Sequence, residues 1–156
     1  MKKFSICMLS LIALLVLASS CKVNLVVLSP KPDDATARVN GYTIDNAGHY
    51  SVHVKFNMVV DQATVVVGKT LILKFSKDQN TTATITWSAN GEELTVTTTK
   101  TRTELNTFNP DDSFSLTLVG TDTGVGVVKS STGKILDGDY QDGAGGNYVM
   151  GFTLIG

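Results

Sequence analysis

The stretch Thr82–Thr99 constrains the fold most, because Asn90-Gly91 stands at its centre between two runs of alternating residues. Asn-Gly is favoured in two-residue hairpin loops of the type I′ turn, where both loop residues need positive φ. This loop gives one apolar and one threonine-rich face, whereas a slip of one residue would mix them. The sequence therefore predicts an antiparallel hairpin with a fixed register. The expected pairs are Trp87 with Leu94, Thr86 with Thr95 and Ile85 with Val96.

Large apolar side chains at inward strand positions are expected to anchor one core. Trp87 is the only tryptophan, and the hairpin pattern places it on the apolar face. A large ring at such a position can fill much of a sandwich interior. The predicted core anchors are Trp87, Leu94, Phe56, Phe114 and Phe152.

Other short segments alternate between apolar and polar residues, as half-buried antiparallel strands do. Tyr50–Asn57 shows the pattern most clearly, and Met58–Val67 is expected to be a crossover with one helical turn. Turn-forming residues separate the segments. Seven or more strands at this spacing favour a β-sandwich. The further predicted strands are Val23–Leu28, Arg38–Ile44, Lys69–Ser76, Ser113–Val119, Val125–Lys129 and Asn147–Ile155.

The N-terminus has the layout of an export signal rather than of folded structure. Lys2 and Lys3 precede the mostly apolar run Phe4–Ala18, which is short for a membrane span. The small residues that lead to Cys21 resemble the lipobox of bacterial lipoproteins, although Ala18 stands where that family prefers leucine. The resemblance implies cleavage before Cys21 and lipid on its thiol and amine. An ordinary signal peptide with an incidental cysteine is the alternative.

Cleavage of residues 1–20 would change the net charge and the cysteine content of the remaining chain. Loss of Lys2 and Lys3 takes the formal net charge from −1 to −3, which is too small to indicate nucleic acid as a partner. Cys21 becomes the only cysteine, so a lipidated protein would have no disulfide. Residues 21–156 suffice for one ordinary core and are predicted to form a single domain. That domain would begin almost directly after Cys21.

Several short motifs stand in a fixed order along the chain. In this order they resemble the bacterial immunoglobulin-like domain of the S-layer (SbsA) type. The resemblance implies an antiparallel Greek-key sandwich of about seven to nine strands, with a spacer, scaffold or adhesion role and without catalytic residues. Met58-Val59-Val60-Asp61 departs from the family's acidic-Pro-Val-Asp step, and Phe114 stands where the family usually has tyrosine. The motifs are Ser29-Pro30, Asp33-Asp34-Ala35-Thr36, Val54-Lys55-Phe56-Asn57, Val60-Asp61-Gln62-Ala63-Thr64-Val65, Ile85-Thr86-Trp87, Leu94-Thr95-Val96, Phe114-Ser115-Leu116-Thr117-Leu118 and Thr132-Gly133-Lys134-Ile135-Leu136-Asp137-Gly138.

One loop concentrates negative charge. Asp137, Asp139 and Asp142 fall within six residues of a glycine-rich segment, and oxygen ligands of this kind suit Ca²⁺. The spacing differs from that of an EF-hand, because Tyr148 stands where the terminal glutamate would be. A solvated polar loop is the alternative. His49 and His53 are expected on an outward strand face, outside any catalytic motif.

The sequence thus predicts a non-enzymatic protein, anchored by lipid on Cys21 in the bacterial cell envelope, with the outer membrane as the expected location. A structural or protein-interaction role fits best, with another envelope protein as partner. The alternative is an adhesin module that binds carbohydrate or peptide. Such a module needs exposed rings for stacking, and the candidates Tyr42, Tyr140 and Phe108 are scattered along the chain. No cofactor is expected other than calcium.

Overall fold

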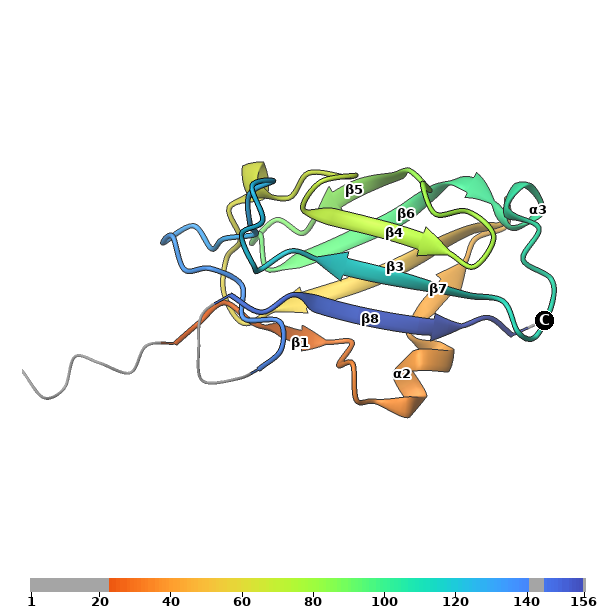
Figure 1. Cartoon of the computed structure of the whole chain (residues 1–156), viewed down its shortest axis with the longest axis horizontal. Helices are drawn as coiled ribbons and strands as arrows, with labels where there is room; N and C mark the ends of the chain where they lie inside the picture. The colour runs from red at the N-terminus through yellow and green to blue at the C-terminus, as the bar shows by residue number, and fades with distance from the viewer. Residues whose placement is uncertain (1–22, 141–144, 156) are drawn as a thin grey trace, which may run out of the picture.

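The computed structural model describes residues 23–140 and 145–155, and these residues fold into two stacked antiparallel sheets (Figure 1). The larger sheet has the order β1-β3-β6-β5, with β2 also paired to β3, and the smaller has the order β4-β7-β8. The strands are β1 (Val27–Ser29), β2 (Tyr42–Ile44), β3 (His49–Phe56), β4 (Leu71–Phe75), β5 (Ala83–Trp87), β6 (Glu93–Thr101), β7 (Ser113–Leu118) and β8 (Tyr148–Thr153).

The strand order identifies the type of sandwich. With β1, β3, β4, β5, β6, β7 and β8 taken as strands A to G, the sheets read A-B-E-D and C-F-G. This is the arrangement of constant-type immunoglobulin domains, in which Greek-key connections join the sheets. The remaining strand, β2, adds to β3 beside strand A. The predicted all-β, immunoglobulin-like sandwich is therefore confirmed.

The β5–β6 hairpin has the predicted register, with Trp87 opposite Leu94 and Ile85 opposite Val96. The predicted turn type is wrong. Gly91 has φ +71°, but Asn90 does not have positive φ, so the turn is not type I′. Its central residues are Ala89 and Asn90, closed by the Gly91 N–H that donates to the Ser88 carbonyl at 3.0 Å. The Asn90 side chain instead accepts from the Glu92 N–H.

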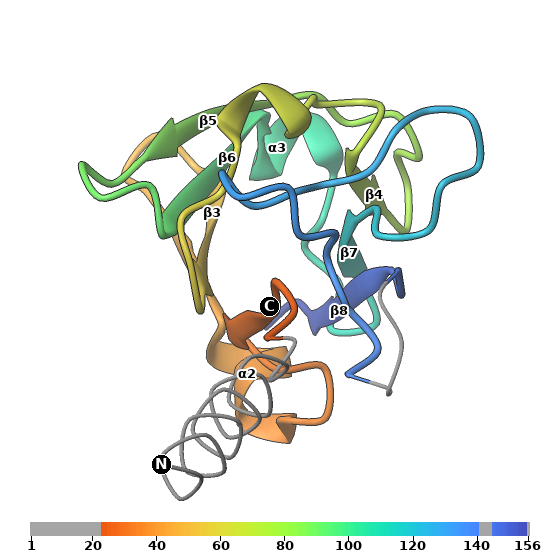
Figure 2. The same ribbon diagram turned by 90° about the vertical axis from the view of Figure 1, so that its left-hand side faces the viewer.

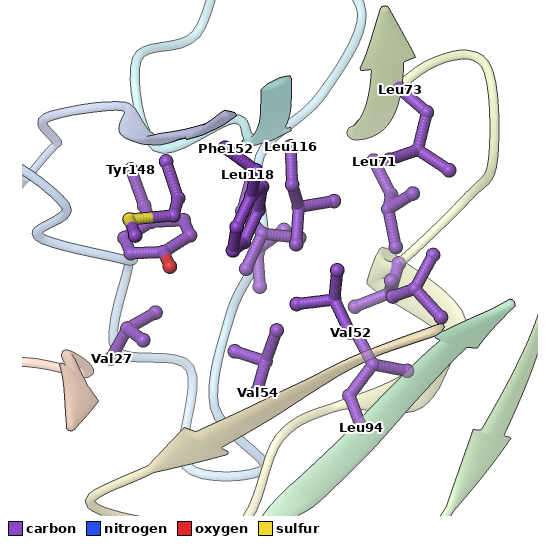
Figure 3. Close-up of a cluster of buried hydrophobic side chains, with 14 of the residues drawn as sticks. Val27, Val52, Val54, Leu71, Leu73, Leu94, Leu116, Leu118, Tyr148 and Phe152 are labelled. Carbon is purple, nitrogen blue, oxygen red and sulfur yellow. The ribbon is translucent and has the colours of Figure 1, made fainter. Parts of the chain in front are cut away.

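The alternating residues of the two sheets face one another across the interior (Figure 3). The inward side chains of β3 are each about 1% exposed, and the outward ones are half-buried or exposed. On β8 the inward positions are equally buried. This strict alternation is what the sequence pattern predicted. The inward residues of these two strands are Tyr50, Val52, Val54 and Phe56 on β3, and Tyr148, Met150 and Phe152 on β8.

Aromatic rings bridge the two sheets at one end of the interior. Phe114 on β7 stacks on Phe152 at 4.5 Å and on Phe75 at 4.8 Å between ring centroids. Tyr50 from the opposite sheet contacts Phe114 at 5.7 Å, and its hydroxyl bonds to Thr107 Oγ1 at 2.8 Å. β3 and β7 are thus joined by rings, where many immunoglobulin domains have a disulfide.

Trp87 lies at the edge of the core rather than inside it. Its side chain is half-buried and stacks on Phe56 at 6.2 Å, whereas its partner Leu94 is fully buried. Trp87 lies at the edge of the core because β5 is the outermost strand of its sheet and has a neighbouring strand on one side only. Phe56, Phe114 and Phe152 are all at most 3% exposed.

Three segments differ from the strands expected for them. The helix α2 (Ala35–Asn40) takes up the first part of Arg38–Ile44 and leaves only β2 as strand. The Asp34 side chain begins this helix by accepting from the N–H groups of Thr36 and Ala37, which is N-capping. In Val125–Lys129, only an isolated bridge at Lys129 forms. In Val23–Leu28, strand β1 begins only at Val27.

Two further short helices lie in the connections. The 3₁₀ turn η1 (Gln62–Thr64) falls in the predicted crossover, and α3 (Arg102–Leu105) follows β6. The long β7–β8 connection runs across the end of the sandwich to this crossover (Figure 2). The Asp61 N–H donates to the Lys129 carbonyl there at 2.8 Å. The connection therefore contacts the β3–β4 crossover before the chain enters β8.

Candidate functional site

The acidic loop after Leu136 lies against the first residues of the sandwich. Leu25 and Leu136 form a parallel bridge, and the Asp137 N–H donates to the Leu25 carbonyl at 2.8 Å. The Asn24 amide donates to Asp137 Oδ2 at 3.1 Å. Positions 24 and 137 are 113 residues apart in sequence. The fold therefore brings the start of the domain and the acidic loop together at one site.

Asp137 is buried, with only 4% of its surface exposed. Its Oδ1 atom has no hydrogen-bond partner, and it is the only buried side-chain oxygen or nitrogen in this condition among the described residues. Burial raises the pKa of Asp137, the Asn24 amide partly offsets this, and the adjacent Asp139 carboxyl raises the pKa further. A buried carboxylate oxygen without a partner is costly, so this position calls for a chemical explanation.

Asp139 is exposed and borders the same position. Its carboxyl packs so closely on Gly146 that a Cβ atom at that glycine would lie 2.2 Å from Asp139 Cγ. The third predicted metal ligand, Asp142, lies outside the described residues. Within the described part of the chain, no three His, Cys, Asp or Glu side chains are grouped to hold a metal ion. The structure therefore brings two of the three predicted ligands together.

A cavity of about 550 Å³ opens beside Asp139. This volume falls within the range of small-molecule sites. Its walls come from the turn after β1 and from both sides of the acidic loop. The lining residues are Lys31, Pro32, Asp33, Gly138, Asp139, Tyr140, Asn147 and Val149.

Tyr140 forms one wall of this cavity and is held in an unusual backbone conformation. Its φ of 58° is in the left-handed region, which is uncommon for a non-glycine residue. Its hydroxyl donates to the Val27 carbonyl at 2.6 Å. Burial, with added repulsion from Asp33 and Asp137, raises the pKa of Tyr140 to about 12. The ring therefore connects the acidic loop to β1 while 42% of the residue stays exposed.

The other two rings expected as ligand platforms are placed elsewhere. Tyr42 belongs to the interior aromatic cluster, 5.6 Å from Phe114, and its hydroxyl accepts from the Ile155 N–H. Phe108 is exposed, with the Arg102 guanidinium 4.9 Å from its ring centroid. Of the three candidates, only Tyr140 lines the cavity.

The two histidines lie on the outward face of β3, as expected, and each has a separate partner. His49 Nδ1 is 3.0 Å from Asp45 Oδ2, and His53 Nδ1 is 3.0 Å from Thr95 Oγ1. Asp45 also accepts the His49 N–H, and the contacts to His49 hold the pKa of Asp45 below its usual value. Each histidine therefore makes its own local contact, and the two histidines do not share one site.

Residues 1–20 and Cys21 lie outside the described residues, as does the predicted cleavage position. None of the helices in residues 23–140 and 145–155 has the length and apolar character that a membrane crossing requires.

Sequence reasoning found the acidic loop but missed the residues that meet it. Asn24, Lys31 and Asp33 come from the first turn of the domain, more than 100 positions earlier. Nothing local in the sequence pairs these segments. The resemblance to an immunoglobulin-like domain could have indicated proximity, because it places the first and last strands in a shared sandwich.

No protein-family model matches the chain, and no curated protein matches it. Among solved structures, it is similar to surface layer protein SbsC, domains 1–6, with 16% identity and a TM-score of 0.45 over 85% of this chain. It is also similar to the S-layer protein rSbsC(31-844), with 14% identity and a TM-score of 0.46 over 84% of this chain. The matches span 14% of each of those chains. The fold assignment rests on this chain's own strand order and registers.

Proposed function

We propose that this protein is a non-enzymatic lipoprotein of the bacterial cell envelope, anchored through Cys21, whose sandwich serves as a structural or protein-interaction module. The export signal and the lipobox-like segment support the anchor. The outer membrane is the location that we propose. The immunoglobulin-like strand order supports the module, because such sandwiches serve as cell-surface domains in many proteins.

The main support for this proposal is that the chain becomes part of the sandwich within a few positions after Cys21. Leu25 is fully buried and bridged to Leu136, although only three residues separate it from Cys21. The Asn57 side chain fixes the same segment, since its amide donates to the Asn24 carbonyl and its oxygen accepts the Val26 N–H. Four extended residues reach at most about 14 Å. A lipid on Cys21 would therefore hold the sandwich close to the membrane surface.

Cys21→Ser tests the anchor, with Cys7→Ser as the matched control in the other cysteine. Each full-length variant is expressed in a bacterial host, the cells are fractionated, and the N-terminal peptide is analysed by mass spectrometry. We expect wild type and Cys7→Ser to sediment with membranes and to begin at an acylated Cys21. Cys21→Ser should lose both properties. A wild-type protein that begins at an unmodified residue and fractionates as soluble protein would refute the proposal.

A second function is favoured by the cavity beside Tyr140, namely binding of a carbohydrate or an extended peptide. The cavity combines the exposed Tyr140 ring with carboxylates and the Asn147 amide, and sugars bind to such a pairing of a flat ring with polar groups. A glycan and peptide array probed with wild type, Tyr140→Ala and Phe108→Ala distinguishes the two functions. Binding that only Tyr140→Ala abolishes would support the second function. An array without wild-type binding would contradict it.

A further inference from the structure

Strand β5 leaves one side of the larger sheet open (Figure 2). It pairs with β6 alone, and this ladder includes a bond from the Ser88 N–H to the Glu93 carbonyl at 2.9 Å. In an antiparallel ladder, hydrogen-bonded residues alternate with residues whose backbone groups point away from the neighbouring strand. The N–H and C=O groups of Ala83, Ile85 and Trp87 therefore point away from β6. These six groups are the β5 edge.

Within the described residues, no hydrogen bond joins the β5 edge to another segment. Strand β4, the outer strand of the smaller sheet, is different because its own flanking chain covers it. The Gly68 N–H donates to the Leu71 carbonyl, and the Phe75 N–H donates to the Asp78 carbonyl, both at 2.8 Å. The contrast shows that the open groups of β5 are not a general property of the outer strands.

The other two outer strands are also partly covered. Beside β1, the Asp137 N–H donates to the Leu25 carbonyl, and the Tyr140 hydroxyl donates to the Val27 carbonyl. The helix α2 lies beside β8 (Figure 1). Gly151 stands in the middle of β8, where it offers no side chain to an added strand. The β5 edge is therefore the best suited of the four to accept a further strand.

Strand β5 also lacks the features that keep strand edges apart. Native proteins protect such edges with charged side chains, proline or bulges. The ten residues 81–90 contain no charged residue and no proline, and the β5–β6 register is regular. The side chains of Ala83, Ile85 and Trp87 are only partly buried, so each keeps apolar surface in solvent. The β5 edge thus offers both hydrogen-bonding groups and apolar surface to an extended strand.

We propose that the β5 strand of a second copy of this chain pairs with the β5 edge, in antiparallel orientation and with the two-fold axis at Ile85. Ile85 then faces Ile85 of the copy, Ala83 faces Trp87, and Thr84 faces Thr86. All six open groups of each copy gain a partner. This is the only two-fold register in which Ala83, Ile85 and Trp87 pair entirely with one another. The small alanine meets the large ring, and threonine meets threonine.

Charge favours a second copy as the occupant. Like charges directly opposite each other destabilise a strand pair, and β5 brings none to its copy. Both charged residues of β6 are already paired within the chain, Glu93 with Lys55 and Lys100 with Asp78. The two strands next to the axis therefore present no unpaired charge, and the contact is the self-complementary kind that a two-fold dimer needs.

The pairing would join the larger sheets of two molecules into one continuous sheet. Two strands of five residues form a small contact beside the ~1,200–2,000 Å² that stable interfaces bury, so we expect a weak and reversible dimer. This inference rests on the proposed interaction role of the sandwich and names its partner, whereas the pairing itself does not require the lipid.

Disulfide cross-linking tests both the pairing and its register. The full-length variants Thr84→Cys and Thr86→Cys, both at exposed positions, are expressed together or singly in a bacterial host. Membrane and soluble fractions are run on non-reducing gels after mild oxidation. Opposite residues of this kind have Cα atoms about 4.5 Å apart, which a disulfide can span. In two copies of one variant the cysteines are offset by about 7 Å along the strand, which is too far.

We expect a cross-linked dimer when both variants are present and little or none when either is expressed alone. The wild type, with its native cysteines, gives the background. If co-expression gave no dimer in either fraction, the pairing would be refuted. Equal cross-linking of the single variants would overturn the register. A dimer found only as soluble, unacylated protein would support the pairing and contradict the lipid anchor, so the two proposals can fail separately.

Charges at the same two positions provide a second test, by sedimentation of the purified full-length protein over a range of concentrations. Thr84→Lys combined with Thr86→Lys puts like charges opposite each other twice, and should weaken the dimer roughly 2- to 30-fold. Thr84→Lys combined with Thr86→Glu puts opposite charges there and should strengthen it. Thr153→Lys, at an exposed position of β8, is the control and should have no effect. Equal weakening by both double variants would refute the β5 contact, and weakening by Thr153→Lys alone would assign the contact to β8 instead.

Discussion

Phe114→Ala should destabilise the protein more than Trp87→Ala, although tryptophan is the larger side chain. Phe114 is 3% exposed and stands at the centre of the aromatic cluster. Its ring centroid lies 4.5 Å from that of Phe152 and 4.8 Å from that of Phe75. Trp87 is half-buried on the edge strand β5, with one ring contact, to Phe56 at 6.2 Å.

The difference follows from burial and from the space that each truncation leaves. Removal of the Phe114 ring opens a closed cavity between the sheets, for which Phe→Ala substitutions cost about 3–5 kcal/mol. Removal of the Trp87 ring leaves an open surface that water can fill. Since part of the side chain is already in water, we expect a loss of only about 1–2 kcal/mol. The two variants should therefore differ by about 2 kcal/mol.

Urea denaturation followed by far-ultraviolet circular dichroism is the suitable assay, because Trp87 is the only tryptophan and its replacement removes the fluorescence signal. Phe114→Leu keeps most of the volume and provides a folded comparison should Phe114→Ala not fold. If Trp87→Ala lost as much stability as Phe114→Ala, the assignment of the core to the aromatic cluster would be wrong.

Two further variants test local features. Asp112→Asn should lower stability at neutral pH and lower it less in acid. The Asn109 N–H bond holds the pKa of Asp112 below its usual value, so the contribution of Asp112 is complete above the usual carboxyl pKa and is lost as pH falls through the lowered pKa. Urea melts at neutral and at acidic pH check this, and an equal loss at both would contradict it. Gly138→Ala should destabilise by about 2–3 kcal/mol or more, because its Cβ would lie 2.0 Å from the Tyr148 nitrogen. Gly151→Ala, with open space around its Cβ, is the control, and an equal loss in both would show that the contact is relieved at no cost.

The local sequence pattern was sufficient to predict the features that depend only on residues close together in the chain. The alternation in Tyr50–Asn57 predicted which side chains of β3 face inward, and the pairing of Trp87 with Leu94 followed from the pattern of the hairpin. Each prediction needs only the two-residue period of a strand. The α2 helix was missed, although its signal is also local, because Asp34 stands at the N-cap position.

The turn of the hairpin shows how two local signals can disagree. The pattern of the flanking strands set the register, but the preference of Asn-Gly for a type I′ turn did not hold. Ser88 and Asn90 use their side chains to bond to the loop backbone, which stabilises a different turn in the same register. Side-chain bonds of this kind compete with the backbone preference.

The sequence by itself determined the strand pattern, the hairpin register and the charge density of the acidic loop. The tertiary structure alone decided which of these features are buried. Asp137 becomes a buried carboxyl only because Leu25 and Asn24 pack against its loop. Trp87 stays partly exposed only because β5 is the last strand of its sheet. The burial of a residue depends on which other segments pack over it. Where those segments lie more than 100 positions away in the sequence, no local pattern predicts the burial.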